Sequence, residues 1–359
     1  MDLTSETVAQ RLPDGLACVA ERINGRLHEL FEAEAERWSG VDPELAVPYA
    51  ALQQIVEAGG KRLRPAFCFF AYAGAGGDPD NEIVVDAGAA LELLHAFAII
   101  HDDIMDGSEL RRGAKSVHRS FTDMHAMENF KREPRRFGEG VAILIGDLAF
   151  VYADSLLESA PAETRRIYTE LRLEVNVGQY LDLIGTARGK PTVDLAERIC
   201  VYKSGKYTVE RPLHIGASLA RANPRVLDQL SAFGLPLGEA FQLRDDMLGA
   251  FGDPAVIGKP VGEDLREGKP TSLVALTLER IAGHERELFL DLFNRAEHDD
   301  ADLATMLGLI EVSGARAMVE SRIDQLVSRS LEALNAADLE AEPKRRLAEL
   351  AVFVANRSL

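Results

Sequence analysis

The chain has 359 residues, 47% of them apolar, and a formal net charge of −18. Its length and apolar content allow a sizeable core, in one large domain or two modest ones. So negative a charge argues against nucleic acid or an anionic membrane surface as the main partner, because both require basic patches. The longest apolar runs, such as residues 96–100, are too short to predict a membrane span.

The three cysteines, Cys18, Cys68 and Cys200, are odd in number and lack the spacing of a metal site. They favour a reduced, cytoplasmic setting, and we expect them to be ordinary core residues. Residues 1–15 lack a basic stretch followed by an apolar one, so no targeting segment is predicted there.

Helical periodicity dominates the chain. Apolar residues recur at steps of three and four from Val19 to Phe31 and from Ile323 to Leu334, and sustained alternation of period two is missing. The sequence therefore predicts an all-α protein, with a single domain over residues 1–359 because no shift in composition marks a boundary. Glycine, proline and charged residues predict loops at residues 74–80, 128–140, 185–191 and 252–270.

An acidic cluster follows His101 and contains Asp102, Asp103 and Asp106. On a helix, Asp102 and Asp106 share a face, whereas Asp103 points about 100° away from Asp102. Mg²⁺ takes one or two protein carboxylates, keeps several waters and completes its octahedron with phosphate oxygens. The pair therefore favours a Mg²⁺ site for a diphosphate, with a solvated helix end as the alternative.

Two basic clusters lie before and after this motif. Residues 59–65 read Gly-Gly-Lys-Arg-Leu-Arg-Pro, and residues 111–113 read Arg-Arg-Gly. Guanidinium groups hold phosphate oxygens bidentately, and Lys supplies a point charge. Either cluster alone fits a soluble surface, but their joint occurrence favours an anionic ligand.

A second acidic cluster, Asp245 and Asp246, follows Gln242 by about one helical turn. The chain then enters the stretch 252–270, which contains Lys259 and Lys269 and shows no apolar periodicity. Such a stretch suits a lid that orders when a diphosphate arrives, or a plain mobile surface loop.

Taken in order, these motifs resemble those of the trans-isoprenyl diphosphate synthases, the polyprenyl synthetase family, and among them bacterial geranylgeranyl diphosphate synthases. The matching motifs are Gly-Lys-Arg at 60–62, Asp-Asp-x-x-Asp at 102–106, Arg-Arg-Gly at 111–113, Gly178-Gln179 with Asp182, Lys203-Ser204, the second Asp pair and the Gly-Lys loop. The resemblance extends over residues 50–275, and the flanking helices carry no signature of their own.

The resemblance implies a bundle of antiparallel helices around a deep central cavity, usually as a homodimer. It also implies a reaction that joins isopentenyl diphosphate head to tail with an allylic prenyl diphosphate. A cluster of three Mg²⁺ ions would be bound by Asp102, Asp106 and Asp245. The allylic diphosphate would be neutralised by Arg111, Lys203 and Lys259.

The remaining implied roles concern the second substrate and the reacting carbon. Isopentenyl diphosphate would be held without metal by Lys61, Arg64, His95 and Arg112, while Lys269 would help to close the lid. Ser204, where the family usually has Thr, keeps a hydroxyl near the reacting carbon, and Gln242 and Asp182 would line the same region.

The second acidic motif departs from the family pattern, because Gly249 stands where a third Asp would be. The geometry of the third ion is therefore in question. Asp246 and Asp264 are the possible supports.

The product length in this family depends on the residues before the first motif, here Phe97 and Ala98. A bulky residue five positions before Asp102 and a small one four positions before it resemble synthases that stop at twenty carbons. We therefore expect geranylgeranyl diphosphate, with a farnesyl or longer polyprenyl product as the alternative. On an ideal wheel Ala98 shares the face of Asp102, whereas Phe97 lies about 140° away.

Two rival functions remain. A class I terpene cyclase also ionises a prenyl diphosphate with this motif, but it does not need Lys61, Arg64 and Arg112, and the chain has few aromatic residues. A non-catalytic regulatory subunit would usually lose the first aspartate motif, which is intact here.

Overall fold

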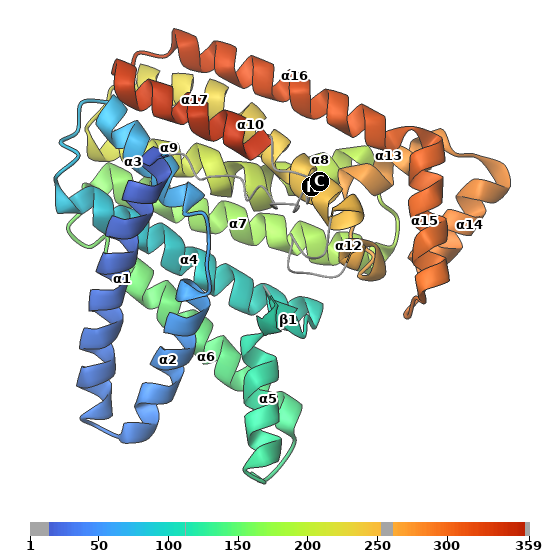
Figure 1. Ribbon diagram of the computed structural model, residues 1–359, viewed down its shortest axis with the longest axis horizontal. Helices are drawn as coiled ribbons and strands as arrows, with labels where there is room; N and C mark the ends of the chain where they lie inside the picture. Colours follow the sequence, from blue (N-terminus) through green and yellow to red (C-terminus); the bar gives the residue numbers. More distant parts are fainter. Residues whose placement is uncertain (1–13, 112, 253–260, 356–359) are drawn as a thin grey trace, which may run out of the picture.

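The structure is a computed structural model that describes residues 14–111, 113–252 and 261–355. Almost every element is a helix, as predicted (Figure 1). The first part comprises α1 (Asp14–Ser39), η1 (Pro43–Leu45), α2 (Ala46–Glu57), α3 (Leu63–Gly74), α4 (Glu82–Asp106), α5 (Val117–Met127) and α6 (Pro134–Ser155). Between α4 and α5, the strands β1 (Leu110–Arg111) and β2 (Ala114–Lys115) pair antiparallel.

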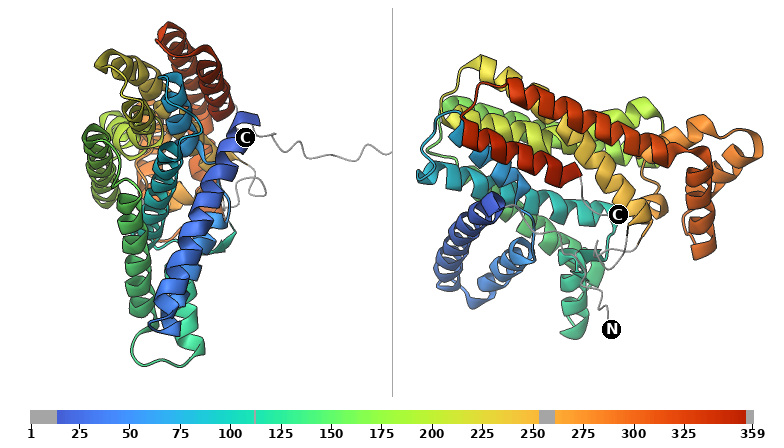
Figure 2. Two further views of the ribbon diagram at one scale, coloured as in Figure 1. Left: turned by 90° about the vertical axis from the view of Figure 1, so that its left-hand side faces the viewer. Right: turned by 45° about the horizontal axis from the view of Figure 1, so that its top comes forward.

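The second part begins with α7 (Ala162–Arg188), α8 (Val193–Ile199), a π-helix η2 (Cys200–Glu210), α9 (Arg211–Leu219) and α10 (Pro224–Phe251). It continues with α12 (Glu263–Arg266), α13 (Ser272–Arg280), α14 (Gly283–Phe293), α15 (Asp300–Ser313), α16 (Ala315–Ala336) and α17 (Ala341–Ala355). Helices α16 and α17 lie side by side along one edge of the bundle (Figures 1 and 2).

Three predicted loops are partly helical. Helix α6 begins at Pro134 inside the predicted loop 128–140, because a proline at the first helical position loses no hydrogen bond. Helix α7 continues to Arg188 and ends at Gly189, whose φ of 59° makes it a left-handed C-cap. The short helix α12 interrupts the stretch 252–270. The periodic segments 19–31 and 323–334 are confirmed as parts of α1 and α16.

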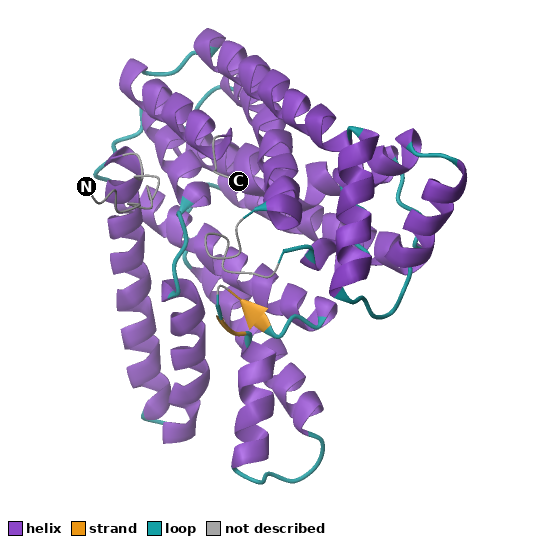
Figure 3. Cartoon of the chain, turned by 45° about the vertical axis from the view of Figure 1, so that its right-hand side comes forward, coloured by secondary structure: helices purple, strands orange, loops and turns teal. Residues whose placement is uncertain are grey.

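Helix α4 packs against α6, α3 and α1 (Figure 1). These helices belong to a bundle in which a single short pair of strands interrupts the helical pattern of the described residues (Figure 3). The length of α4 and its mean hydropathy of 1.9 are those of a helix that could cross a membrane, but 67% of its apolar window is buried inside the protein. No other helix in the described part meets the same criteria of length and hydropathy. An apolar helix covered by its neighbours is what the core of a helical bundle requires.

The core consists of two apolar clusters that meet along α10 and α16. The larger contains the inner faces of α1, α3, α4, α6, α7 and α9, and the smaller joins α13, α14 and α15. Leu237 of α10 belongs to the first cluster, whereas Leu243, nearly two turns later, belongs to the second. The helix that carries the second acidic motif therefore packs in both clusters.

Two glycines allow unusually close contacts with the π-helix η2. A Cβ on Gly178 of α7 would lie 2.4 Å from the backbone nitrogen of Lys203, and a Cβ on Gly238 of α10 would lie 2.5 Å from Cα of Gly205. No side chain fits at such distances, so each glycine brings its helix against the η2 backbone. Residues 203–205 are thereby held between α7 and α10.

The Gly178→Ala variant should lose about 1–3 kcal/mol of unfolding free energy, because its methyl group forces α7 away from η2. Chemical denaturation followed by circular dichroism measures the change. Gly308→Ala on α15 is the matched control, since nothing lies within 4 Å of that added methyl. A Gly178→Ala variant as stable as the control would contradict the close packing of α7 on η2.

Candidate active site

The C-terminal end of α4 carries two aspartates on one face, as predicted, and each pairs with a lysine from elsewhere in the chain. Lys203 Nζ of η2 lies 3.2 Å from Asp102 Oδ1, and Lys269 Nζ lies 2.8 Å from Asp106 Oδ2. Gln179 of α7 also donates to Asp102 Oδ1, at 2.8 Å. Both aspartate side chains are largely buried, so the structure brings together groups separated by up to 163 positions.

The two carboxylates differ in their electrostatic surroundings. Burial opposes ionisation of Asp102, but Lys203, Lys269 and Arg111 outweigh it and lower the pKa of Asp102. Burial and the neighbouring Asp102 raise the pKa of Asp106, despite its contact with Lys269. Two like charges on one helix face therefore need external cations for both to ionise.

Asp103 has a different role from the other two aspartates. Its side chain is buried and accepts hydrogen bonds from Nε and Nη2 of Arg111 in β1, the former at 2.9 Å. The same guanidinium approaches Asp102 Oδ2 to 3.9 Å. Asp103 thus fixes Arg111, the predicted phosphate-binding residue, beside Asp102.

The predicted catalytic residues form two hydrogen-bonded groups, one around Lys203 and one around Ser204, which are neighbours in η2. Lys203 Nζ donates to the buried Asp182 Oδ2 at 2.6 Å as well as to Asp102. The next residue, Ser204, donates to Oε1 of Gln242, whose amide donates to Asp246 Oδ1 at 2.7 Å. Burial, first, and then Asp264 raise the pKa of Asp246 well above its ordinary value.

The second acidic motif presents its two aspartates differently. Asp245, the predicted metal ligand, is exposed, whereas Asp246 is buried. At Gly249, where the family has an aspartate, a Cβ would lie 3.2 Å from Oδ2 of Asp264. The carboxylate of Asp264 therefore lies beside the place where the missing side chain would begin, and Lys269 Nζ is 3.9 Å from its Oδ1.

The cations of the basic cluster at residues 59–65 lie in different surroundings. Arg62 turns into the core, where it pairs with Glu92 at 2.6 Å and donates to the backbone of Val56. Lys61 is exposed and lies over the ring of Phe353 in α17. Arg62 therefore serves the core, and the diphosphate-binding role of Lys61 and Arg64 stays a prediction.

Arg64 and His95 are linked through one tyrosine of η2. The guanidinium of Arg64 lies 4.3 Å from the ring centre of Tyr207 and donates to Thr208, while Tyr207 Oη is 3.2 Å from His95 Nδ1. The buried Nε of Arg64 has no hydrogen-bond partner. The predicted residues Arg112 and Lys259 lie outside the described residues.

Lys206, an extra cation two positions after Ser204, points away from the aspartates. Its Nζ pairs with Glu174 Oε1 at 2.6 Å, and Arg211 binds both oxygens of that carboxylate. Hydrogen bonds and charge from two cations thus fix the C-terminal part of η2 to α7.

The two residues of the predicted chain-length pair lie in different surroundings. Ala98 is half-buried on the face of Asp102, as the helical wheel predicts. Phe97 packs instead against Phe150 of α6, with ring centres 4.8 Å apart, and against His101 at 4.6 Å. His101 itself turns toward α6, 3.2 Å from the carbonyl of Ile143, and takes no part in the acidic face.

The donor set fits Mg²⁺. Asp102 and Asp106 present carboxylate oxygens, which this hard cation prefers, and two ammonium groups now balance their charge. Within the described residues, no three His, Cys, Asp or Glu side chains form a ready metal cage. Two carboxylates without a cage suit a metal that completes its shell with water and phosphate.

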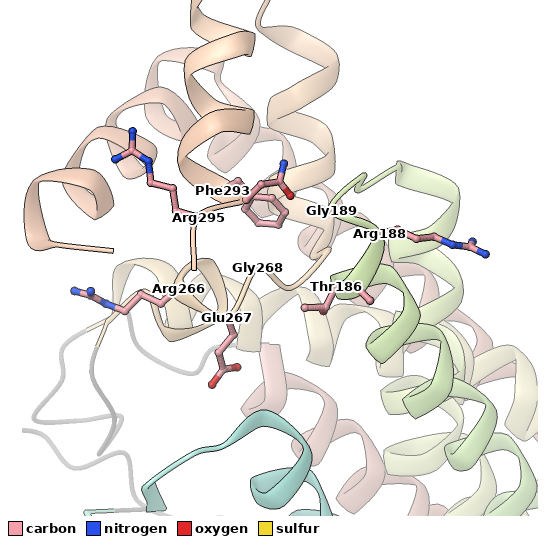
Figure 4. A pocket seen from close by; sticks show the side chains of 10 residues that line it. Thr186, Arg188, Gly189, Arg266, Glu267, Gly268, Phe293 and Arg295 are labelled. Carbon is pink, nitrogen blue, oxygen red and sulfur yellow. The ribbon is translucent and has the colours of Figure 1, made fainter. Parts of the chain in front are cut away.

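A small hollow of about 290 Å³ lies behind the segment that carries Lys269, between the end of α7 and the end of α14 (Figure 4). Glu267 borders this hollow, and its carboxylate pairs with Lys269 Nζ at 2.7 Å. None of the predicted site residues in the described part of the chain lines this hollow, so the predicted site at the acidic face of α4 lies outside it.

The sequence and the fold of this chain are similar to those of known proteins. The family model of the polyprenyl synthetases matches residues 46–310. A crystal structure of geranylgeranyl pyrophosphate synthase from Corynebacterium glutamicum, complexed with isoprenyl diphosphate and magnesium, is 36% identical, covers 97% of this chain and 100% of its own, and superposes with a TM-score of 0.90.

Two curated relatives have related names. Geranylgeranyl diphosphate synthase of Sulfolobus acidocaldarius is 31% identical over 89% of this chain and 92% of its own length. Geranylfarnesyl diphosphate synthase of Aeropyrum pernix is 30% identical over 84% of this chain and 92% of its own. The relatives thus share one reaction type and differ in the length of the named product.

The Glu174→Gln variant should lose about 1.5–3 kcal/mol of unfolding free energy at pH 7, because Lys206 and Arg211 lose a charged acceptor. Burial opposes the ionisation of Glu174, but hydrogen bonds from Arg211 and Lys206 outweigh it and lower its pKa. The stabilisation is therefore complete above the unfolded carboxyl pKa of about 4.3 and is lost as the pH falls through the folded value.

Denaturation curves recorded at several values from pH 7 to pH 3 give the free energy of unfolding at each pH. This free energy should fall less with decreasing pH for Glu174→Gln than for the unsubstituted protein. Glu163→Gln, which breaks the exposed pair with Arg166, is the matched control and should change little. Equal effects of the two substitutions would contradict a stabilising role for the Glu174 cluster.

Proposed function

Since the chain belongs to the polyprenyl synthetase family and is a trans-prenyltransferase, we propose that it condenses isopentenyl diphosphate with allylic diphosphates to make geranylgeranyl diphosphate. The observation that carries this proposal is the pairing of Asp102 with Lys203 and of Asp106 with Lys269. In this proposal, the same two lysines would also contact a diphosphate bound at this helix end.

The first step is heterolysis of the carbon–oxygen bond between the allylic group and its diphosphate. Three Mg²⁺ ions, held by Asp102, Asp106 and Asp245, would supply Lewis-acid stabilisation of the departing oxygens. Lys203 and Lys269, with Arg111, add fixed positive charge where negative charge accumulates. Asp182 holds the Lys203 ammonium in place at 2.6 Å.

The second step joins the allylic cation to the double bond of isopentenyl diphosphate. Arg64 and His95 meet at Tyr207, three positions after Ser204, so this proposed diphosphate site adjoins the reacting end through η2. The hydroxyl of Ser204 and the amide of Gln242 line the region of the cation. A proton then passes to the released pyrophosphate, and the chain is five carbons longer.

A product of twenty carbons is supported by Phe97, a bulky residue on the fifth position before Asp102, with the small Ala98 beside it. The two named relatives differ at this level, one making a geranylgeranyl and the other a geranylfarnesyl product by name. Phe97 is held by ring contacts on two sides and is therefore a firm obstacle to a growing tail.

We also propose that the chain forms a homodimer through α6 and α7. Helix α7 exposes Leu173, Val177 and Tyr180 at helical spacing, the last with 66% of its surface accessible, and α6 exposes Leu144 and Val151. An apolar stripe of this size on adjacent chain segments suits a second copy of the same surface.

Purified protein with Mg²⁺, labelled isopentenyl diphosphate and each allylic starter should yield mainly twenty-carbon product on chromatography. A product of another length would refute the proposed length and keep the reaction. Cyclic hydrocarbon from a prenyl diphosphate alone would instead support a cyclase, and no product at all would support an inactive subunit.

Asp102→Asn should lower kcat by about 10²–10³-fold, because it removes one charged ligand while keeping the shape of the side chain. Chelation with EDTA should stop the wild-type reaction, and added Mg²⁺ should restore it. The exposed Asp324 of α16 provides the matched control, since Asp324→Asn should keep full activity. Normal turnover by Asp102→Asn would contradict the assigned role.

Val177→Glu should turn the proposed dimer into a monomer, because it places a charge in an apolar interface. Light scattering coupled to size exclusion should then give a mass near the 39.2 kDa of one chain, against about twice that for the unsubstituted protein. Val312→Glu, at an exposed apolar position of α15, should leave the dimer intact. A wild-type protein of monomer mass would rule out this interface.

A further inference from the structure

Three carboxylates surround the ammonium group of Lys269. Its Nζ lies 2.8 Å from Asp106 Oδ2, 2.7 Å from Glu267 Oε2 and 3.9 Å from Asp264 Oδ1. Asp106 belongs to the predicted metal pair, and Asp264 lies beside Gly249 in the second acidic motif. Glu267 has neither of these roles, although its contact with Lys269 is the shortest of the three.

The backbone that carries Lys269 is fixed independently of the ammonium group. The backbone nitrogen of Lys269 donates to the carbonyl of Asp264 at 2.9 Å, and the nitrogen of Thr271 donates to the carbonyl of Lys269 at 2.8 Å. The next residue, Pro270, is buried so close to α7 that a Cβ on Gly185 would lie 2.8 Å from its Cγ. The ion pairs are therefore needed to direct the flexible four-carbon side chain, not to place its Cα.

Glu267 lies on the same short segment as Lys269, two positions before it. Gly268 between them has a φ of 68°, a left-handed conformation that favours glycine. The side chains of Arg266 and Glu267 leave this segment in different directions, and Arg266 pairs with the first residue of α15 (Figure 4). The carboxylate of Glu267 thus belongs to the segment that carries Lys269, whereas Asp106 belongs to α4.

The two close carboxylates differ in what they can do when a diphosphate binds. In the proposed function, Asp106 turns to Mg²⁺, so that Lys269 loses this partner. Glu267 can keep its contact, because an ammonium group has three donors and one of them suffices for the carboxylate. The other donors then remain available for diphosphate oxygens, and the side chain of Lys269 is already oriented when the carbon–oxygen bond breaks.

We propose that Glu267 is a positioning residue of the reaction, which holds the Lys269 ammonium in the orientation that stabilises the departing diphosphate. The inference rests on the proposed prenyl transfer and deepens it. Glu267 acts through Lys269 and contacts neither substrate nor metal. Its own negative charge opposes the binding of an anionic substrate, so its removal should slow turnover without weakening substrate binding.

The first test is steady-state kinetics of Glu267→Gln and Glu267→Ala with an allylic diphosphate. The kcat should fall about tenfold or more, because Lys269 is no longer held in place, while KM for the allylic diphosphate should not rise. Glu267→Asp, which keeps the charge, should recover part of the lost kcat. Glu279→Ala, at an exposed position of α13, is the matched control and should leave both constants unchanged. A raised KM with normal kcat would overturn the positioning role.

A double-mutant cycle tests whether Glu267 acts through Lys269. Glu267→Gln should lower kcat in the unsubstituted protein and leave that of Lys269→Gln unchanged. The same four proteins, freed of metal and substrate, provide a second measurement. Their thermal unfolding midpoints should show that Glu267→Gln destabilises more when Lys269 is present than when it is replaced. Equal effects in the two backgrounds would overturn the inference.

The two proposals fail in different ways. A wild-type protein that does not elongate any starter would overturn the proposed function and the role of Glu267 together. Wild-type elongation with normal kcat in Glu267→Gln would overturn the role of Glu267 alone. If Glu267→Ala does not fold by circular dichroism, Glu267→Gln decides the question, since it keeps the length and volume of the side chain.

Discussion

The site depends on one electrostatic constraint: three carboxylates are concentrated at the C-terminal end of α4, where the helix dipole is already negative. Such an end is stable only with cations close by. Lys203, Lys269 and Arg111 supply them from a π-helix, a loop and a two-stranded ribbon. Much of the surrounding fold can be understood as the means of bringing these three elements to one helix end.

The π-helix is the most constrained of the three. Gly178 and Gly238 allow α7 and α10 to contact its backbone, and Glu174 fixes its far end through Lys206 and Arg211. Lys203 is therefore held at a fixed position opposite Asp102, and Ser204 opposite Gln242. Such preorganisation matters because charge that is already oriented needs no rearrangement when the carbon–oxygen bond breaks.

The sequence predicted the features that depend on local spacing. Asp102 and Asp106 share a face because the helical period requires it. Lys203 could be identified because its motif stands at the expected place in the order of the family's motifs along the chain. Features that depend on packing were not predictable. Arg62 lies one position from Lys61 yet turns inward to Glu92. Asp264 was a possible support from the sequence, but its position beside Gly249 depends on tertiary packing near the end of α10.

Calorimetric titration with a non-reactive allylic diphosphate analogue, with and without Mg²⁺, tests the central claim most directly. If the carboxylates of α4 and the opposing lysines share one diphosphate through bridging cations, the analogue should bind tightly only with Mg²⁺, and Asp102→Asn should remove most of that gain. Equal affinity with and without Mg²⁺ would contradict the account, because the diphosphate would then be bound by the basic residues alone.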